Sequence, residues 1–113
     1  MLKISGVGID IVSINRIEKI YNKYKEKFTN KIFTSNEIQE AIEKGHFMQS
    51  LSGKFSAKEA FIKASNKKIY NLKDIEVLSN MDGKPYINFE NKKYNLLSIS
   101  HEKDYAIAVV IIQ

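Results

Sequence analysis

The hydrophobic pattern changes its period twice along the chain, and this change limits the folds that the sequence can adopt. Residues 4–11 alternate as in a β-strand, with Val7, Ile9 and Ile11 on one face. From Ser13 the apolar positions recur every three or four residues, as in a helix, and strand-like runs return after residue 74. An N-terminal strand, three helices and then an antiparallel meander predict an α+β domain.

The ends of the expected helices carry recognisable signals. Ser13 is expected to cap the first helix, and residues 34–37 have the form of a capping box that opens the second. Gly45 is expected to stop that second helix, because glycine readily takes the left-handed conformation that follows a helix. The predicted helices cover, in order, residues 13–28, 34–44 and 46–65.

The last third of the chain reads as strands. Residues 75–77 and 86–89 are expected to pair across a turn at residues 81–85, and a second hairpin is expected to pair residues 95–101 with Tyr105–Ile112. The final run is apolar on both faces, which predicts a central place in the sheet or a contact with another subunit. Because no repeat or linker interrupts the pattern, residues 1–113 are expected to form a single domain.

Composition narrows the range of partners and compartments. The 113 residues include no cysteine, so neither a disulfide nor a thiolate site is available. Neither a signal peptide nor an apolar stretch of about 20 residues is evident, so we expect a cytoplasmic protein that does not span a membrane. The net charge of +5 favours an anionic partner, which includes phosphate groups, an acidic protein and nucleic acid.

Two acidic residues stand where patterning alone would not place them. Asp10 shares a strand face with Gly6 and Gly8, which would allow close approach of another backbone or a ligand. Glu59 continues a step-of-four apolar stripe through Phe47, Leu51 and Phe55. A buried carboxylate must be paired, hydrogen-bonded or metal-bound. Two such acids without histidine or cysteine suit Mg²⁺, which commonly also binds substrate phosphates.

Each of these residues also has an ordinary explanation. Asp10 would serve equally well as a cap for the following helix, and Glu59 would form a surface pair with Lys63 worth roughly 0.2–0.5 kcal/mol. The basic face of the first helix (Arg16, Lys19, Lys23 and Lys27) would simply be solvated, although Arg16 is the sole arginine and suits bidentate binding of carboxylate or phosphate. Lone histidines are usually structural or exposed; this applies to His101, and His46 is interpreted as incidental.

The spacing of these residues resembles a known signature. The short bacterial type of the 4′-phosphopantetheinyl transferases, the holo-[acyl-carrier-protein] synthases, joins Gly-x-Asp through a spacer to Phe/Trp-x-x-Lys-Glu-Ala-x-x-Lys. Here Gly8-Ile9-Asp10 is followed by residues 11–54 and then by the segment Phe55–Lys63, which reads FSAKEAFIK. Further matches in family order are Arg16-Ile17, the segment 74–77, the segment Asp82–Tyr86 and Ser98–His101.

The resemblance implies an activity and a set of roles. It implies transfer of 4′-phosphopantetheine from coenzyme A to a serine of apo acyl-carrier protein, with release of adenosine 3′,5′-bisphosphate, in support of fatty acid biosynthesis. Asp10 and Glu59 match the magnesium ligands, and Lys63 matches a lysine that acts as a charge clamp or proton acceptor; these three form the expected catalytic set. It also implies a homotrimer with active sites between subunits. The coenzyme A contacts would be Lys54, Lys63, Gly83, Pro85, Ser100 and His101, and the carrier-protein surface would be Arg16, Lys19 and Lys23.

Three positions depart from the family pattern, and two other functions remain open. Lys54 stands where many relatives have arginine, residues 66–68 replace a glycine-rich turn, and Glu102 stands where threonine is frequent. The main alternative is a basic, non-catalytic nucleic-acid-binding module, supported by the net charge and the lysine-rich first helix. A further alternative is a catalytically silent or secondary-metabolism transferase. If the chain is a transferase of this family, neither nucleic acid nor a membrane is an expected partner.

Overall fold

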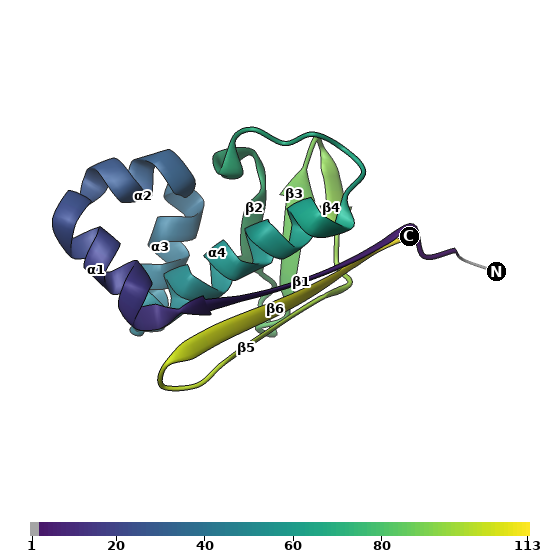
Figure 1. The fold of residues 1–113 in the computed structure, drawn as a ribbon. Helices are drawn as coiled ribbons and strands as arrows, with labels where there is room; N and C mark the ends of the chain where they lie inside the picture. The colour runs from purple at the N-terminus through teal and green to yellow at the C-terminus, as the bar shows by residue number, and fades with distance from the viewer. Residues whose placement is uncertain (1–2) are drawn as a thin grey trace.

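The computed structural model describes residues 3–113 and has the α+β class expected from the sequence (Figure 1). Its strands and helices follow the predicted order, strand, helices and strands. In chain order they are β1 (Gly6–Ser13), α1 (Ile14–Tyr24), α2 (Glu26–Ile32), α3 (Ser35–Lys44), α4 (Phe47–Ala64), a 3₁₀ turn (Leu72–Asp74), β2 (Glu76–Ser79), β3 (Pro85–Phe89), β4 (Lys92–Tyr94), β5 (Leu97–His101) and β6 (Tyr105–Ile112).

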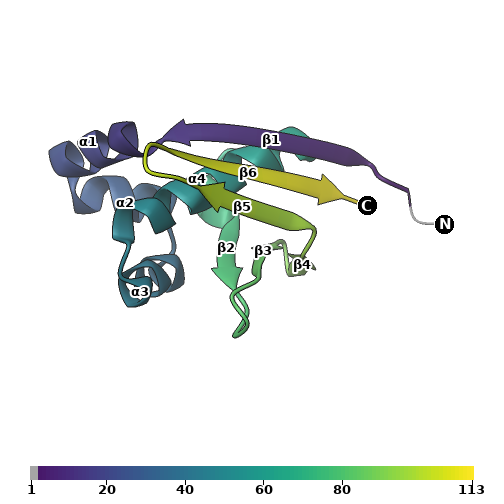
Figure 2. The same ribbon diagram turned by 90° about the horizontal axis from the view of Figure 1, so that it is seen from below.

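The strands form two antiparallel sheets and not one continuous meander. One sheet has the order β1-β6-β5 and the other the order β2-β3-β4. The final strand, β6, is the central strand of its sheet, as its apolar sequence predicted. The helices α1, α2 and α3 gather at one end of the molecule, while the start of β1 and the C-terminus lie at the other end (Figure 2).

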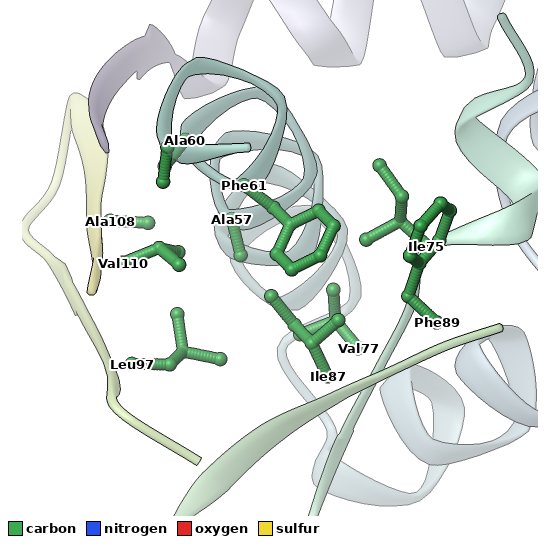
Figure 3. Packing of buried hydrophobic residues seen from close by; sticks show 11 residues of the cluster. Ala57, Ala60, Phe61, Ile75, Val77, Ile87, Phe89, Leu97, Ala108 and Val110 are labelled. Atoms are coloured by element: carbon green, nitrogen blue, oxygen red, sulfur yellow. The ribbon is translucent and has the colours of Figure 1, made fainter. Parts of the chain in front are cut away.

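The long helix α4 packs between the two sheets and forms the centre of the core. On one side Ala57 and Ala60 face Ala108 and Val110 of β6, and on the other side Phe61 approaches the second sheet (Figure 3). The Phe61 ring meets the ring of Phe89 at 5.3 Å between centroids. Because α4 is buried on both sides, it sets the distance between the two sheets. It also holds its own side chains in fixed positions relative to both sheets.

Two glycines bring β1 into direct contact with α4. A Cβ atom on Gly6 or Gly8 would lie 1.8 Å from the carbonyl oxygen of Ala64 or Ala60, respectively, so only glycine fits. The close backbone approach expected from the sequence is thereby confirmed. The opposite face of β1 carries Val7, Ile9 and Ile11, which are 58%, 61% and 58% exposed in the single chain.

The first predicted helix is wrong in extent, because residues 3–113 contain four α-helices where three were expected. The backbone of Lys25 takes a positive φ of 48° and separates α1 from α2, which also places Lys27 on α2. The other helix signals are confirmed: Ser13 caps α1, the Thr34–Glu37 capping box opens α3, and Gly45 ends α3 with φ of 80°. Strand β4 was not predicted. In the part of the chain that the structure describes, no helix has the length and apolar character of a membrane span.

Candidate active site

Asp10 and Lys63 meet where β1 crosses the C-terminal half of α4. The Nζ atom of Lys63 donates to Asp10 Oδ1 at 3.2 Å and to the carbonyl oxygen of Ile9 at 3.0 Å. The hydroxyl of Ser56, on the same helix, donates to the carbonyl oxygen of Asp10 at 2.8 Å. Gly8 allows the close crossing described above. The crossing therefore sets the position of the Asp10 carboxylate relative to α4.

Glu59 lies one helical turn before Lys63 and shares its surroundings with Asp10. Burial raises the pKa of the Glu59 carboxyl, the negative charge of Asp10 raises it further, and the positive charge of Lys63 opposes both effects. The two acids that the sequence singled out are therefore close enough to interact. Their mutual repulsion, in a half-buried place, favours binding of a cation or a proton there.

The chemistry of this acidic pair fits a hard divalent cation. Asp10 Oδ2 is buried and has no hydrogen-bond partner, while the whole Asp10 side chain is only 15% exposed. A buried carboxylate oxygen without a partner is costly unless a cation binds it. Among residues 3–113 no group of three or more His, Cys, Asp or Glu side chains is placed to hold a metal. Two carboxylates alone suit Mg²⁺, which keeps several waters and binds substrate phosphates as well.

The ordinary explanations of these two acids do not match the structure. The hydroxyl of Ser13, and not the carboxylate of Asp10, accepts the capping hydrogen bond at the start of α1, from the backbone N–H of Arg16 at 3.2 Å. Lys63, which would have paired with Glu59 along the helix surface, donates to Asp10 instead. The structure thus brings together the three residues of the expected catalytic set.

A cavity of about 280 Å³ lies near the β5 edge of the β1-β6-β5 sheet, whereas Asp10 lies on β1 at the opposite edge. Four of the six expected coenzyme A contacts line it: Lys54, Gly83, Pro85 and His101. These residues come from α4, the β2–β3 turn, β3 and the end of β5. The structure therefore assembles most of this predicted set from segments that are far apart in the sequence.

Lys54 is held tightly in the wall of this cavity. Its side chain is only 5% exposed, and its Nζ atom bonds to the Glu40 carboxylate and donates to the carbonyl oxygen of Val77 at 2.8 Å. Burial lowers the pKa of the Lys54 ammonium, and the nearby Glu40 opposes that effect. Two of the three donors of Lys54 are thus engaged within the protein, which leaves a single N–H for an external anion.

The two remaining members of the expected coenzyme A set lie elsewhere. Ser100 lines a shallow hollow on the opposite face of the sheet, with Ile11 and Ile107. Lys63 is paired with Asp10 and does not line the cavity. In the sheet register Asp10 of β1 and Ile99 of β5 both pair with Ala108 of β6. Because β6 separates the two edges, the acidic pair and the cavity of one chain do not form one continuous site.

The expected carrier-protein residues all project from the exposed face of α1. Arg16, Lys19 and Lys23 are exposed. Arg16 also borders a hollow of about 240 Å³ that includes the apolar side chains of Ile20 and Phe55. A lone guanidinium beside an apolar hollow is suited to a partner that offers a carboxylate next to an apolar side chain.

The sequence alone did not reveal a buried ion pair that joins α4 to α3. Lys58 and Glu37 are both fully buried, and Lys58 Nζ donates to Glu37 Oε1 at 2.8 Å. Burial raises the pKa of Glu37 and lowers that of Lys58, and the attraction between the two charges opposes both shifts. The available signal was the step of four between two lysines, Lys54 and Lys58, on a helix whose flanking residues are largely apolar or small.

Comparisons with known proteins find relatives along nearly the whole chain. Residues 6–110 match the family model of the 4′-phosphopantetheinyl transferase superfamily. A holo-[acyl-carrier-protein] synthase of Thermodesulfovibrio yellowstonii is 49% identical over 112 residues, which cover 96% of this chain and 98% of the relative. The corresponding enzyme of Halothermothrix orenii is 42% identical and likewise matches 96% of both chains.

Solved structures of the same family superpose closely. The holo-[acyl-carrier-protein] synthase of Neisseria meningitidis gives a TM-score of 0.87 at 30% identity, with 98% of this chain and 99% of that chain covered. The synthase of Bacillus anthracis, crystallised in complex with CoA (3′,5′-ADP), gives 0.81 at 39% identity, with 96% and 95% covered. With the matched family model and these relatives, the chain belongs to the 4′-phosphopantetheinyl transferase superfamily, as an enzyme of the holo-[acyl-carrier-protein] synthase family.

Proposed function

We propose that this enzyme transfers 4′-phosphopantetheine from coenzyme A to a serine of apo acyl-carrier protein in a magnesium-dependent reaction. The serine oxygen forms a bond to the phosphorus of the phosphopantetheine group, and the bond from that phosphorus to adenosine 3′,5′-bisphosphate breaks. The observation that carries the proposal is the meeting of Asp10, Glu59 and Lys63 where β1 crosses α4. The relatives named above support the substrates.

In this proposal Asp10 and Glu59 hold Mg²⁺. The partnerless Oδ2 atom of Asp10 and the raised pKa of Glu59 both support a bound cation. When bound, the ion would neutralise negative charge on the diphosphate of coenzyme A. Lys63 adds a second positive charge beside the same carboxylate, and it serves as a charge clamp for the phosphate that is transferred.

The nucleotide end of coenzyme A is assigned to the cavity at the other edge of the sheet. Lys54, Gly83, Pro85 and His101 line it, with Ser100 on the reverse face of the sheet. Because β6 separates the cavity from the acidic pair in one chain, we propose that the complete active site combines the acidic pair of one subunit with the cavity of another.

The exposed sheet face is the surface that would bring subunits together. Val7, Ile9 and Ile11 of β1, together with Tyr105 and Ile107 of β6, form a continuous exposed apolar face. Contiguous apolar surface of this kind commonly marks an interface. We propose a homotrimer assembled through this face, which also places Ser100 at a subunit boundary.

The exposed basic face of α1 is proposed as the docking surface for the carrier protein. Arg16, Lys19 and Lys23 supply positive charge, and the apolar hollow beside Arg16 would receive an apolar side chain of the partner. The charge reversal Arg16→Glu is expected to impair use of the carrier while coenzyme A binding persists. Lys92→Glu, on the distant strand β4, is the matched control, and an equal loss of both substrates in Arg16→Glu would contradict the assignment.

The cellular role follows from the substrate. A carrier protein that receives phosphopantetheine can bind acyl groups as thioesters, so we propose a role in fatty acid biosynthesis in the cytoplasm. The nucleic-acid-binding alternative has no support beyond the net charge and the lysine-rich first helix, and binding of phosphate groups and of a carrier protein would account for both. A silent transferase is disfavoured by the intact set of Asp10, Glu59 and Lys63.

The direct test is intact-mass analysis of apo acyl-carrier protein after incubation with enzyme, coenzyme A and Mg²⁺. The wild type is expected to add the mass of one phosphopantetheine group. Asp10→Ala and Glu59→Ala are expected to lose nearly all transfer while keeping their circular dichroism spectra. Glu90→Ala, which removes an exposed carboxylate at the end of β3, is the matched control. Transfer at the wild-type rate by either acid variant would overturn the metal assignment.

A further inference from the structure

The hydroxyl of Ser56 joins the strand that carries one member of the acidic pair to the helix that carries the other. Ser56 is fully buried on α4, and its Oγ atom donates to the main-chain carbonyl oxygen of Asp10 at 2.8 Å. Glu59 follows three residues later on α4, and residues three apart are neighbours on the surface of a helix. One hydrogen bond therefore connects the backbone of Asp10 to the helical turn that presents Glu59.

The acidic pair needs such a connection because its two carboxylates repel each other. The negative charge of Asp10 is one of the causes that raise the pKa of the Glu59 carboxyl. One divalent ion can bind both groups only while they stay within reach of a single coordination sphere. Before an ion binds, contacts between β1 and α4 must hold that spacing against the repulsion.

Lys63 also bonds α4 to this part of β1, but it is poorly suited to hold the spacing alone. Its side chain is 55% exposed, and it donates both to Asp10 Oδ1 and to the carbonyl oxygen of Ile9. The proposed function also requires its ammonium group to contact the transferred phosphate. Ser56, by contrast, has no access to solvent, and its bond to the main chain occupies neither carboxylate oxygen of Asp10.

We infer that Ser56 is a positioning residue for the metal, whose hydroxyl holds Asp10 at the distance from Glu59 at which one ion binds both acids. The inference rests on the proposed function, which assigns Mg²⁺ to this pair, and Ser56 stands at an unspecified position of the family signature. Groups that orient metal ligands without touching the ion commonly raise metal affinity. Without the hydroxyl, the binding-competent spacing is populated less often, and the apparent affinity for the ion falls by the same factor.

Ser52, one helical turn earlier on α4, provides a matched control. It is fully buried like Ser56, but its Oγ atom has no hydrogen-bond partner among residues 3–113. Ser52→Ala and Ser56→Ala remove the same atom from the same helix, and only the second removes a bond to Asp10. Ser56→Cys is the third variant, because a thiol fills the site left by the hydroxyl while donating only weakly.

The test titrates Mn²⁺ into protein saturated with coenzyme A and follows the electron paramagnetic resonance signal of free Mn²⁺, with Asp10→Ala as the background. Ser52→Ala is expected to bind Mn²⁺ as the wild type does. Ser56→Ala and Ser56→Cys are expected to bind it roughly fivefold more weakly, the factor that corresponds to one hydrogen bond of ordinary strength. All variants should keep the circular dichroism spectrum of the wild type.

The possible outcomes separate this inference from the proposed function. Equal Mn²⁺ affinity in the wild type and in Ser56→Ala would overturn the inference while leaving the proposed function intact. An equal loss in Ser52→Ala, or wild-type affinity in Ser56→Cys, would also overturn it, because either result would trace the effect to packing and not to the bond with Asp10. Mn²⁺ binding that is the same in the wild type and in Asp10→Ala would instead overturn the proposed function.

Discussion

Replacing Lys58 by methionine is expected to destabilise the protein far more than an exposed lysine replacement would. Lys58 is fully buried, and methionine keeps its approximate length while removing its charge and donors. The Nζ atom donates to Glu37 Oε1 at 2.8 Å and to the carbonyl oxygens of Leu72 and Ile75 at 2.9 and 2.6 Å. The variant would leave one carboxylate and two carbonyl groups without these partners.

The magnitude follows from what remains buried. Removing one partner of a buried ion pair costs about 3–5 kcal/mol, because the other charge stays uncompensated. Glu37 keeps two backbone donors, the N–H groups of Thr34 and Val77, each at 2.8 Å. We therefore expect the lower end of the range, about 3 kcal/mol, which is a large part of the stability of about 5–15 kcal/mol typical of a domain.

The assay is urea unfolding followed by circular dichroism, at one protein concentration because an oligomer unfolds in a concentration-dependent way. The control is Lys67→Met, which removes an exposed lysine paired with Glu90 and should leave the urea midpoint unchanged. Adding Glu37→Gln to Lys58→Met should recover part of the loss, since no buried charge is then left unpaired. Equal midpoints for Lys58→Met and Lys67→Met would refute the reasoning.

Three further predictions test β1, the acidic pair and the apolar face. Gly8→Ala should lower the urea midpoint and abolish transfer, because its Cβ would meet the Ala60 carbonyl, whereas Gly53→Ala should be mild, because its Cβ would meet only the Ile99 side chain. In the presence of a metal chelator, Glu59→Gln should stabilise the protein at pH 7.5, because the charged Glu59 carboxylate is half-buried beside Asp10. This stabilisation should shrink as pH falls through the raised pKa of Glu59, and it should vanish below pH 4.5, where the wild-type carboxyl is neutral in both the folded and the unfolded protein. Ile9→Asp should convert a trimer to monomers in light scattering, and a monomeric wild type would contradict the proposed interface.

Most local elements could be predicted because their signals lie within a few residues. The cap at Ser13, the capping box at Thr34–Glu37 and the stop at Gly45 each depend on a side chain or a backbone angle close by in sequence. The acidic pair could also be predicted, because Asp10 shares a strand face with two glycines and Glu59 continues an apolar stripe of its helix. In both cases one residue type conflicts with its local pattern.

Features that depend on distant partners could not be read in the same way. The break at Lys25 lies inside a continuous apolar stripe, and no glycine or proline marks the positive φ there. The burial of Lys58 depends on Glu37 of another helix, which local periodicity does not reveal. The same is true of His46, which lines the cavity together with residues of β5 that are far away in the sequence.

The most direct test of the central claim is a crystal structure of the enzyme with coenzyme A and Mn²⁺ in place of Mg²⁺, with an anomalous difference map at the manganese edge. We expect one strong peak coordinated by carboxylate oxygens of both Asp10 and Glu59, in contact with the diphosphate of coenzyme A. A peak bound elsewhere, or two carboxylates too far apart to share one ion, would contradict the claim that this pair holds the metal of the transfer reaction.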